Sequence, residues 1–270
     1  MTRKRLDNIL RKEWKLIFTE LNSSLMITLL PLLIVAQALF YIWLIARYGT
    51  EAIISNQILQ AALEKLANAL PSVASLPIEQ QLQVLLLSQF NLFLLLIPTM
   101  VAINIAAFSI VEEKISRSLE PLLATPVRTW ELLLGKALAG AIPALIVTWF
   151  YSLVFLAAVK MLGWGHLLPF VLTSSWFISL FLLTPAVAVL SFMLGVVGSS
   201  KAADAKSAQN IALVIIFPIM ALVGVQVAGL VFFTPLLTLA LALGVGLIDV
   251  IVLRIAVQLF QRESIVVKWH

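Results

Sequence analysis

The chain has 270 residues, of which 62% are hydrophobic and 11% charged, and its mean hydropathy is +1.08. Soluble domains are closer to half apolar and a quarter charged, so the composition predicts an all-α protein that crosses a membrane several times. The absence of cysteine excludes disulfides, thiolate catalysis and cysteine-ligated metals. The net charge of +5 does not indicate nucleic-acid binding, because the basic residues flank apolar runs, where they set topology and contact anionic lipids.

Residues 1–23 predict an amphipathic helix that lies in the membrane interface. Apolar residues recur at helical spacing and the remainder is strongly basic, which is typical of such helices. An ordinary basic flank that only fixes orientation is the alternative. The apolar stripe consists of Leu6, Leu10, Trp14, Ile17 and Leu21.

Six apolar runs follow, and a crossing needs roughly 20 apolar residues. They predict a six-span domain over 24–257 and a cytoplasmic tail over 258–270. Pro185, in the middle of the fourth run, predicts a kink. The predicted spans are 24–46, 82–111, 137–159 and 167–197, with two more sharing 211–253 and joined near 233–235.

Residues 47–81, between the first two runs, are predicted to lie on the external side of the membrane and to contain a second amphipathic helix. Its stripe ends at Pro71 and Pro77, which cannot continue a helix. A tight external turn is expected at 160–166. The stripe consists of Ile54, Ile58, Ala62, Leu66 and Leu70.

The distribution of lysine and arginine predicts the orientation. Fifteen of these residues fall in the segments placed inside, against three outside, which are Arg47, Lys65 and Lys160. The positive-inside rule therefore places both termini and the central loop in the cytoplasm, with the chain in the inner cell membrane.

The densest polar segment, 112–136, lies between the second and third spans and predicts a short helix. Ser118 is a good N-cap, and Glu120 falls in the first turn, where the helix dipole favours an anion. Thr125-Pro126 ends this helix, and Thr129 begins the next one.

Three leucines, Leu119, Leu122 and Leu123, share one face of this short helix. Exposed leucines at a membrane surface favour docking on a partner's hydrophobic groove. The alternative is a loop helix that packs on its own bundle, with its charges solvated.

Catalytic motifs are incomplete. Glu112-Glu113 and Arg117 spell EExxxR, which looks like the first motif of the CAAX/Abi intramembrane proteases, but the only histidines are His166 and His270, neither placed to assist. Gly135-Lys136 lacks the flanking residues of a phosphate-binding loop. We therefore expect no catalytic, cofactor-binding or metal-binding residues.

Few ionisable residues lie within the spans. Asp249 and Arg254 favour an ion pair over a proton relay. The neutral amides of Gln37, Asn104 and Gln226 favour hydrogen bonds between helices.

The central segment closely resembles the signature of type-2 ABC transporter permeases. In that signature an acidic pair precedes Thr-Leu-Glu, Leu-Leu-Ala-Thr-Pro-Val, Glu-Leu and Gly-Lys. Arg117-Ser118 replaces the usual Gly-Thr, and 227–235 leaves room for only a short re-entrant hairpin. The matching pieces are Glu112-Glu113, Ser118-Leu119-Glu120, Leu122–Val127, Glu131-Leu132 and Gly135-Lys136.

The resemblance implies the transmembrane subunit of an ATP-driven exporter. Its coupling helix, 118–125, would bind a separate ABC ATP-binding subunit, present in two copies, which would hold ATP and Mg²⁺. A second permease subunit, a copy or a paralogue, would complete the path. An ion-coupled carrier without an ATPase and a non-transporting scaffold are the alternatives. The apolar spans suit a lipid-like cargo better than a small ion. Polysaccharides, drugs and sodium are not excluded as cargoes, because the family transports each of them. The implied coupling residues are Glu112, Glu113, Ser118, Leu119, Glu120, Leu122, Leu123, Thr125 and Pro126.

Overall fold

The structure is a computed structural model that describes residues 21–48, 57–115, 129–201, 206–207, 210, 213–228 and 230–259. These residues form an all-helical bundle with no strand among them. The predicted interfacial helix and the predicted tail lie almost entirely outside the described residues, so both stay predictions. The helices are α2 (Leu21–Tyr48), α4 (Gln57–Ala69), α5 (Ile78–Phe93), α6 (Leu96–Ile115), α8 (Thr129–Val159), α9 (Leu168–Val171), α10 (Ser174–Ile178), α11 (Thr184–Lys201), α13 (Ile216–Val227) and α14 (Pro235–Leu259).

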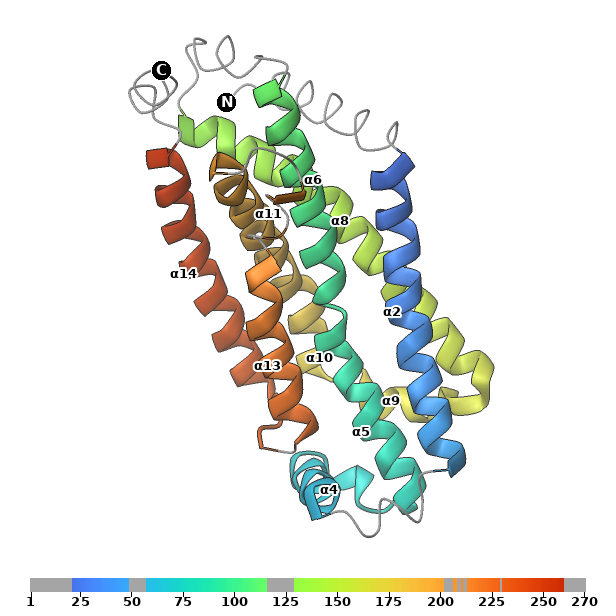
Figure 1. The fold of residues 1–270 in the computed structure, drawn as a ribbon. Helices are drawn as coiled ribbons and strands as arrows, with labels where there is room; N and C mark the ends of the chain where they lie inside the picture. Colours follow the sequence, from blue (N-terminus) through green and yellow to red (C-terminus); the bar gives the residue numbers. More distant parts are fainter. Residues whose placement is uncertain are drawn as a thin grey trace.

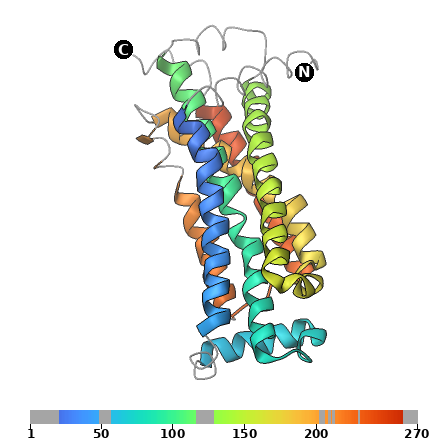
Figure 2. The ribbon, with the colours of Figure 1, turned by 90° about the vertical axis from the view of Figure 1, so that its right-hand side faces the viewer.

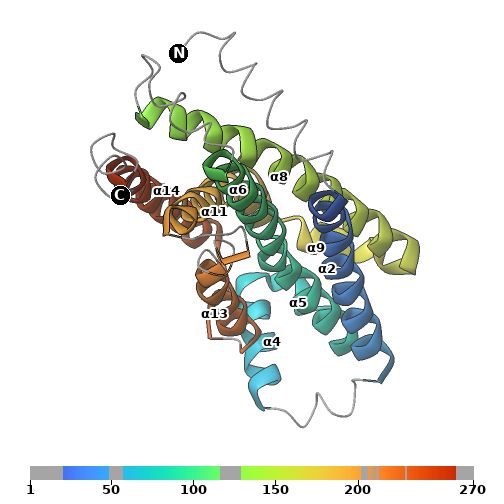
Figure 3. The same cartoon turned by 45° about the horizontal axis from the view of Figure 1, so that its top comes forward.

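The long helices run alternately up and down the bundle, and α4 lies across one end of it (Figures 1 and 2). We call this the α4 end. The opposite end, where α6 ends and α8 begins, is called the loop end. Seen from above, α6 lies between α8 and α11 (Figure 3), and it contacts both.

Among the described residues, five helical segments are long and apolar enough to cross a membrane. The predicted fifth span is shorter: α13 has 12 residues, and at 1.5 Å per residue it measures about 18 Å against a hydrocarbon layer of about 30 Å. Pro218, which lacks an N–H, is the third residue of α13, a position where that N–H has no intrahelical partner. The five segments are Ile27–Leu44, Ile78–Ser109, Trp130–Val171, Ser174–Ser199 and Pro235–Leu259.

Local sequence explains where α14 begins. Pro235 is its first residue, a position where the missing N–H has no intrahelical partner. Thr234 caps it, because its Oγ1 accepts a hydrogen bond from Leu237 N at 3.4 Å. The helix continues to Leu259, past the predicted limit of 253.

The predicted second and fourth spans are both interrupted. The second divides into α5 and α6 at Leu94–Leu95, four residues before Pro98. Proline lacks the N–H that a continuous helix would need there, so it is accommodated in the first turn of α6.

The fourth span is irregular just before Pro185, as predicted, where Ser179–Leu183 form a π-helical turn. Proline leaves carbonyl groups of the preceding turn without a helical partner. A side chain supplies one missing donor, because Trp149 Nε1 donates to Leu180 O at 3.2 Å. Ser179 O keeps the backbone N–H of Thr184 as a donor and also accepts a hydrogen bond from the Thr184 hydroxyl at 2.8 Å. A second break, with Thr173 extended, separates α9 from α10 and was not predicted.

The amphipathic helix predicted within 47–81 is present as α4, and its stripe residues Ala62 and Leu66 are fully buried. Helix α4 contacts α5 and α13. At the same end of the bundle, the predicted turn at 160–166 contains Gly163 with φ of 88°, a left-handed conformation that favours glycine.

Candidate functional site

The predicted coupling residues lie in and around the segment between α6 and α8. Glu112 and Glu113 belong to the last turn of α6. Helix α8 begins at Thr129, where the sequence predicts a helix start. The other residues, and with them the predicted coupling helix, lie outside the described residues; they are Ser118, Leu119, Glu120, Leu122, Leu123, Thr125 and Pro126.

Lys136 of the same motif joins the two helices that flank this segment. Its side chain is 3% exposed, and within the described part of the chain no other charged side chain is buried. Lys136 Nζ donates a hydrogen bond from α8 to Ser109 Oγ of α6 at 3.2 Å. A buried ammonium group is costly unless it is hydrogen-bonded, so this contact fixes α6 against α8 near the loop end.

Two glycines bring α11 into close contact with the same helices. A Cβ atom on Gly140 of α8 would collide with the ring of Phe192 of α11. A Cβ atom on Gly195 of α11 would lie 2.6 Å from the Cβ atom of Ala106 of α6. Small residues let membrane helices approach closely, so α6, α8 and α11 form one tightly packed block, which we call the glycine block.

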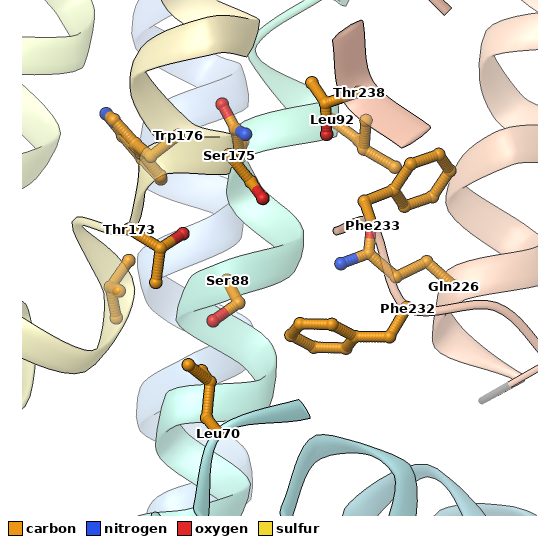
Figure 4. Close-up of a pocket in the computed structure, with 12 residues that line it drawn as sticks. Leu70, Ser88, Leu92, Thr173, Ser175, Trp176, Gln226, Phe232, Phe233 and Thr238 are labelled. Carbon is orange, nitrogen blue, oxygen red and sulfur yellow. The ribbon is translucent and has the colours of Figure 1, made fainter. Parts of the chain in front are cut away.

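A second candidate site, which the sequence did not predict, is a small cavity toward the α4 end (Figure 4). It measures about 30 Å³. It lies between α5, the break before α10, the end of α13 and the beginning of α14. We call it the Gln226 cavity, and its polar lining consists of Ser88, Asn91, Thr173, Ser175, Gln226 and Thr238.

Gln226 is a buried polar residue of this cavity, and one of its side-chain atoms has no hydrogen-bond partner. Its side chain is 5% exposed, and its Oε1 atom has no hydrogen-bond partner. Figure 4 shows the amide directed into the space beside α5, next to Phe232 and Phe233. A buried carbonyl oxygen without a donor costs about 1–3 kcal/mol, so a donor placed in this cavity would be favourable.

Two predictions about polar residues in the spans are wrong. Gln37 Nε2 lies 3.5 Å from the hydroxyl of Tyr41 on its own helix, and Gln226 Oε1 has no partner, so neither forms the predicted bond between helices. Asp249 and Arg254 form no ion pair: Asp249 Oδ1 is buried without a hydrogen bond and Arg254 is exposed. Five residues along a helix correspond to a rotation of about 140°, so the two side chains leave α14 in different directions.

The helices and the motif define a membrane protein of the ABC permease class. Residues 44–243 match the family model described as "ABC-2 family transporter protein". The match covers most of the chain, so the chain belongs to the ABC-2 transporter family, as its central motif predicts. Comparisons with curated proteins and with solved structures gave no match.

Proposed function

We propose that this chain is the permease subunit of an ATP-driven exporter, and that two permease subunits, most simply two copies of this chain, form the transport path. The family match carries this proposal. Each subunit would bind a separate ABC ATP-binding protein through the helix 118–125. That partner would hold ATP and Mg²⁺, since Gly135-Lys136 lacks the flanking residues of a phosphate-binding loop.

The proposed topology has six crossings, with α13 as a short fifth one. The alternating directions of the helices in Figure 1 support it. The lysine and arginine count of fifteen against three then assigns the loop end and both termini to the cytoplasm. The α4 end faces the opposite side of the membrane.

The surface of α14 leaves room for a second permease subunit. Only 11% of its spanning residues are buried within this chain. Large apolar side chains such as Leu236, Leu243 and Leu247 are exposed, so lipid or a second permease subunit must cover them.

The coupling mechanism follows from the contacts at the loop end. ATP binding would bring the two ATP-binding subunits together and move the helix 118–125. Because Lys136 and Ser109 connect α8 to α6, and Gly195 sits against Ala106, such a movement would carry α6, α8 and α11 together. The two membrane halves would then shift between closed and open states.

An ion-coupled carrier remains the alternative, and no specific observation favours it. Such carriers place ionisable groups along an ion path. Within the described residues the one fully buried charge, Lys136, lies at the loop end of α8 and is hydrogen-bonded to Ser109.

The deciding experiment is purification of the tagged chain from its native cells in a mild detergent, with identification of the proteins that accompany it. We expect an ATP-binding protein with a phosphate-binding loop to accompany the wild type and to be lost from the double variant Leu122→Asp, Leu123→Asp. A matched control is Met161→Asp, Leu162→Asp, which places the same charges on two exposed apolar residues at the α4 end. If both variants retain the ATP-binding protein, the proposed role of the helix 118–125 in coupling is wrong. If no ATP-binding protein accompanies the wild type, the ion-coupled carrier is favoured.

A further inference from the structure

The Gln226 cavity is lined by hydrogen-bonding groups without charge. All its described polar residues carry hydroxyl or amide side chains, and three aromatic residues, Trp176, Phe232 and Phe233, complete the wall. An ion entering this cavity would lose its hydration without gaining an opposite charge. The lining therefore suits a neutral group that can donate a hydrogen bond, such as a hydroxyl, an amide or water.

The unpartnered Oε1 atom of Gln226 gives the cavity a defined acceptor. The cavity volume of about 30 Å³ is enough for one or two water molecules, because about 10–15 Å³ is needed for one. In this conformation it is therefore a site for a water-sized group. A larger polar group would require the wall to move.

The backbone beside the cavity is not helical. Thr173 has an extended conformation, with ψ of 170°, at the break between α9 and α10. Residues on both sides of this break, Val171 and Ser175, line the cavity. Non-helical backbone at membrane depth is tolerated where it is buried in protein or lines a water-filled cavity, and here it borders the polar lining.

Two segments form the wall nearest the α4 end, and an exposed hydrogen bond links helix α4 to the second of them. Leu70, directly after α4, and the loop 230–234, which contains Phe232 and Phe233, both line the cavity. Lys65 Nζ on α4 donates to the carbonyl oxygen of Leu230 at 3.0 Å. Leu230 lies just beyond α13, where the helix dipole favours a cation.

We propose that the Gln226 cavity is a water-accessible binding site for an uncharged hydrogen-bonding group. The loop 230–234 forms a lid over it, and the contact of Leu230 with Lys65 of the packed helix α4 holds this lid closed. Because Lys65 is exposed, water competes for this contact, which is therefore weak enough to open. If the chain is an exporter, as proposed above, the bound group is the hydroxyl- or amide-bearing part of its cargo.

The natural absence of cysteine makes the site directly testable. Ser88→Cys places a nearly isosteric thiol in the cavity wall on α5. The purified chain is treated with three methanethiosulfonates, carrying a neutral hydroxyethyl, an anionic sulfonatoethyl or a cationic trimethylammonioethyl group. Each rate is divided by the rate with free 2-mercaptoethanol.

We expect the neutral reagent to modify Ser88→Cys at least about tenfold faster than either charged reagent, because a charge would be desolvated without compensation. Ser191→Cys is the matched control, since Ser191 is fully buried in α11 and does not line the cavity. It should stay unreactive. Equal rates for the three reagents, or a Ser88→Cys thiol as unreactive as Ser191→Cys, would overturn the binding site.

The lid is tested by adding Lys65→Met to Ser88→Cys. Loss of the hydrogen bond to Leu230 should raise the rate with the neutral reagent about fivefold, the factor expected for one such contact. Lys65→Arg, which keeps a donor, and Lys160→Met, which removes an exposed lysine away from the lid, should leave the rate unchanged. No increase with Lys65→Met, or the same increase with Lys160→Met, would overturn the lid.

The two arms are independent. The charge selectivity is measured with Lys65 intact, so it tests the cavity even if Lys65→Met fails to fold. Misfolding of the Lys65→Met protein would be detected by combining it with Ser191→Cys, because the buried thiol would then become reactive. Neither arm needs an ATP-binding subunit. The site can therefore fail while the proposed export function stands, and it can be confirmed in a chain that binds no ATPase.

Discussion

Helix α8 is held by two different kinds of contact along its length. Near the loop end it belongs to the glycine block, in which Gly140 lies directly against Phe192. Toward the α4 end it contacts α5 and α10 through an aromatic stack. There Phe155 lies between Phe90 and Trp176, with ring centroids 3.6 Å and 6.5 Å away.

The difference concerns how far the helices can move. Backbones in contact through glycine leave no volume for a shift, because any side chain there collides with its neighbour. Stacked rings tolerate offset arrangements, so helices separated by rings can slide. Trp176 also lines the Gln226 cavity, which places the adaptable contacts next to the only polar cavity described above. The chain is therefore rigid near the proposed coupling helix and adaptable at the opposite end.

The largest expected effect is on the aromatic stack. Phe155→Ala should lower the free energy of unfolding by about 3–5 kcal/mol, because it removes a fully buried ring and leaves a cavity. Phe150→Ala is the matched control, since that ring is 59% exposed on the same helix, and it should cost less than about 1 kcal/mol. Unfolding of the purified chain in denaturant measures both. Equal losses would show that the stack contributes no more than the exposed ring.

An added methyl group tests the glycine block. Gly195→Ala should destabilise the chain by about 1–3 kcal/mol, because the new Cβ atom would lie 2.6 Å from that of Ala106. Gly244→Ala, in α14, has open space around the new atom and should instead stabilise the helix by about 0.5–1 kcal/mol. The same unfolding measurement applies. A gain in stability from both substitutions would show that α6 and α11 can separate.

The contact between α6 and α8 is tested by Ser109→Ala. Removing the acceptor of the Lys136 ammonium should cost about 1 kcal/mol more than Ser191→Ala. Ser191 is also a buried serine, but its hydroxyl donates to Val187 O of its own helix at 2.6 Å. If the two substitutions cost the same, the hydrogen bond from Lys136 adds nothing to the block.

The smallest effect is expected for Arg254→Gln on α14. Because Arg254 is exposed and forms no ion pair with Asp249, stability should change by less than about 0.5 kcal/mol. Thermal unfolding of the two proteins in the same detergent measures this change. A decrease in the free energy of unfolding of more than about 1 kcal/mol would indicate that Arg254 and Asp249 form the ion pair that the sequence suggested.

The sequence predicts the helices better than the contacts between them. Long apolar runs locate the membrane-crossing segments, and the spacing of Ala62 and Leu66 locates α4, because both signals are local. Thr129 is the first described residue of α8, and because residues 116–128 lie outside the described ranges, the predicted cap at Thr129 stays a prediction. The family also follows from local motif residues, which the match over 44–243 confirms.

The Gln226 cavity could not be predicted, because its lining comes from four separate parts of the chain. Gln226 and Thr238 are single polar residues in apolar runs, where such a residue suggests only a bond between helices, and no spacing in the sequence connects them with Ser88 or Thr173. The division of the second span at Leu94–Leu95 was missed for a different reason. Pro98 marks it, but whether a proline bends or interrupts a helix depends on the packing around it.

The π-helical turn at Ser179–Leu183 makes the α4 end sensitive to the length of the chain. A π turn holds an extra residue compared with an α turn. If the same residues formed α turns instead, α10 would be rotated by about 100° relative to α11. Trp176 would leave the aromatic stack and Ser175 would leave the cavity, while Gly195 would keep its place against Ala106. The geometry of the cavity therefore depends on the number of residues that precede Pro185 as well as on their identity.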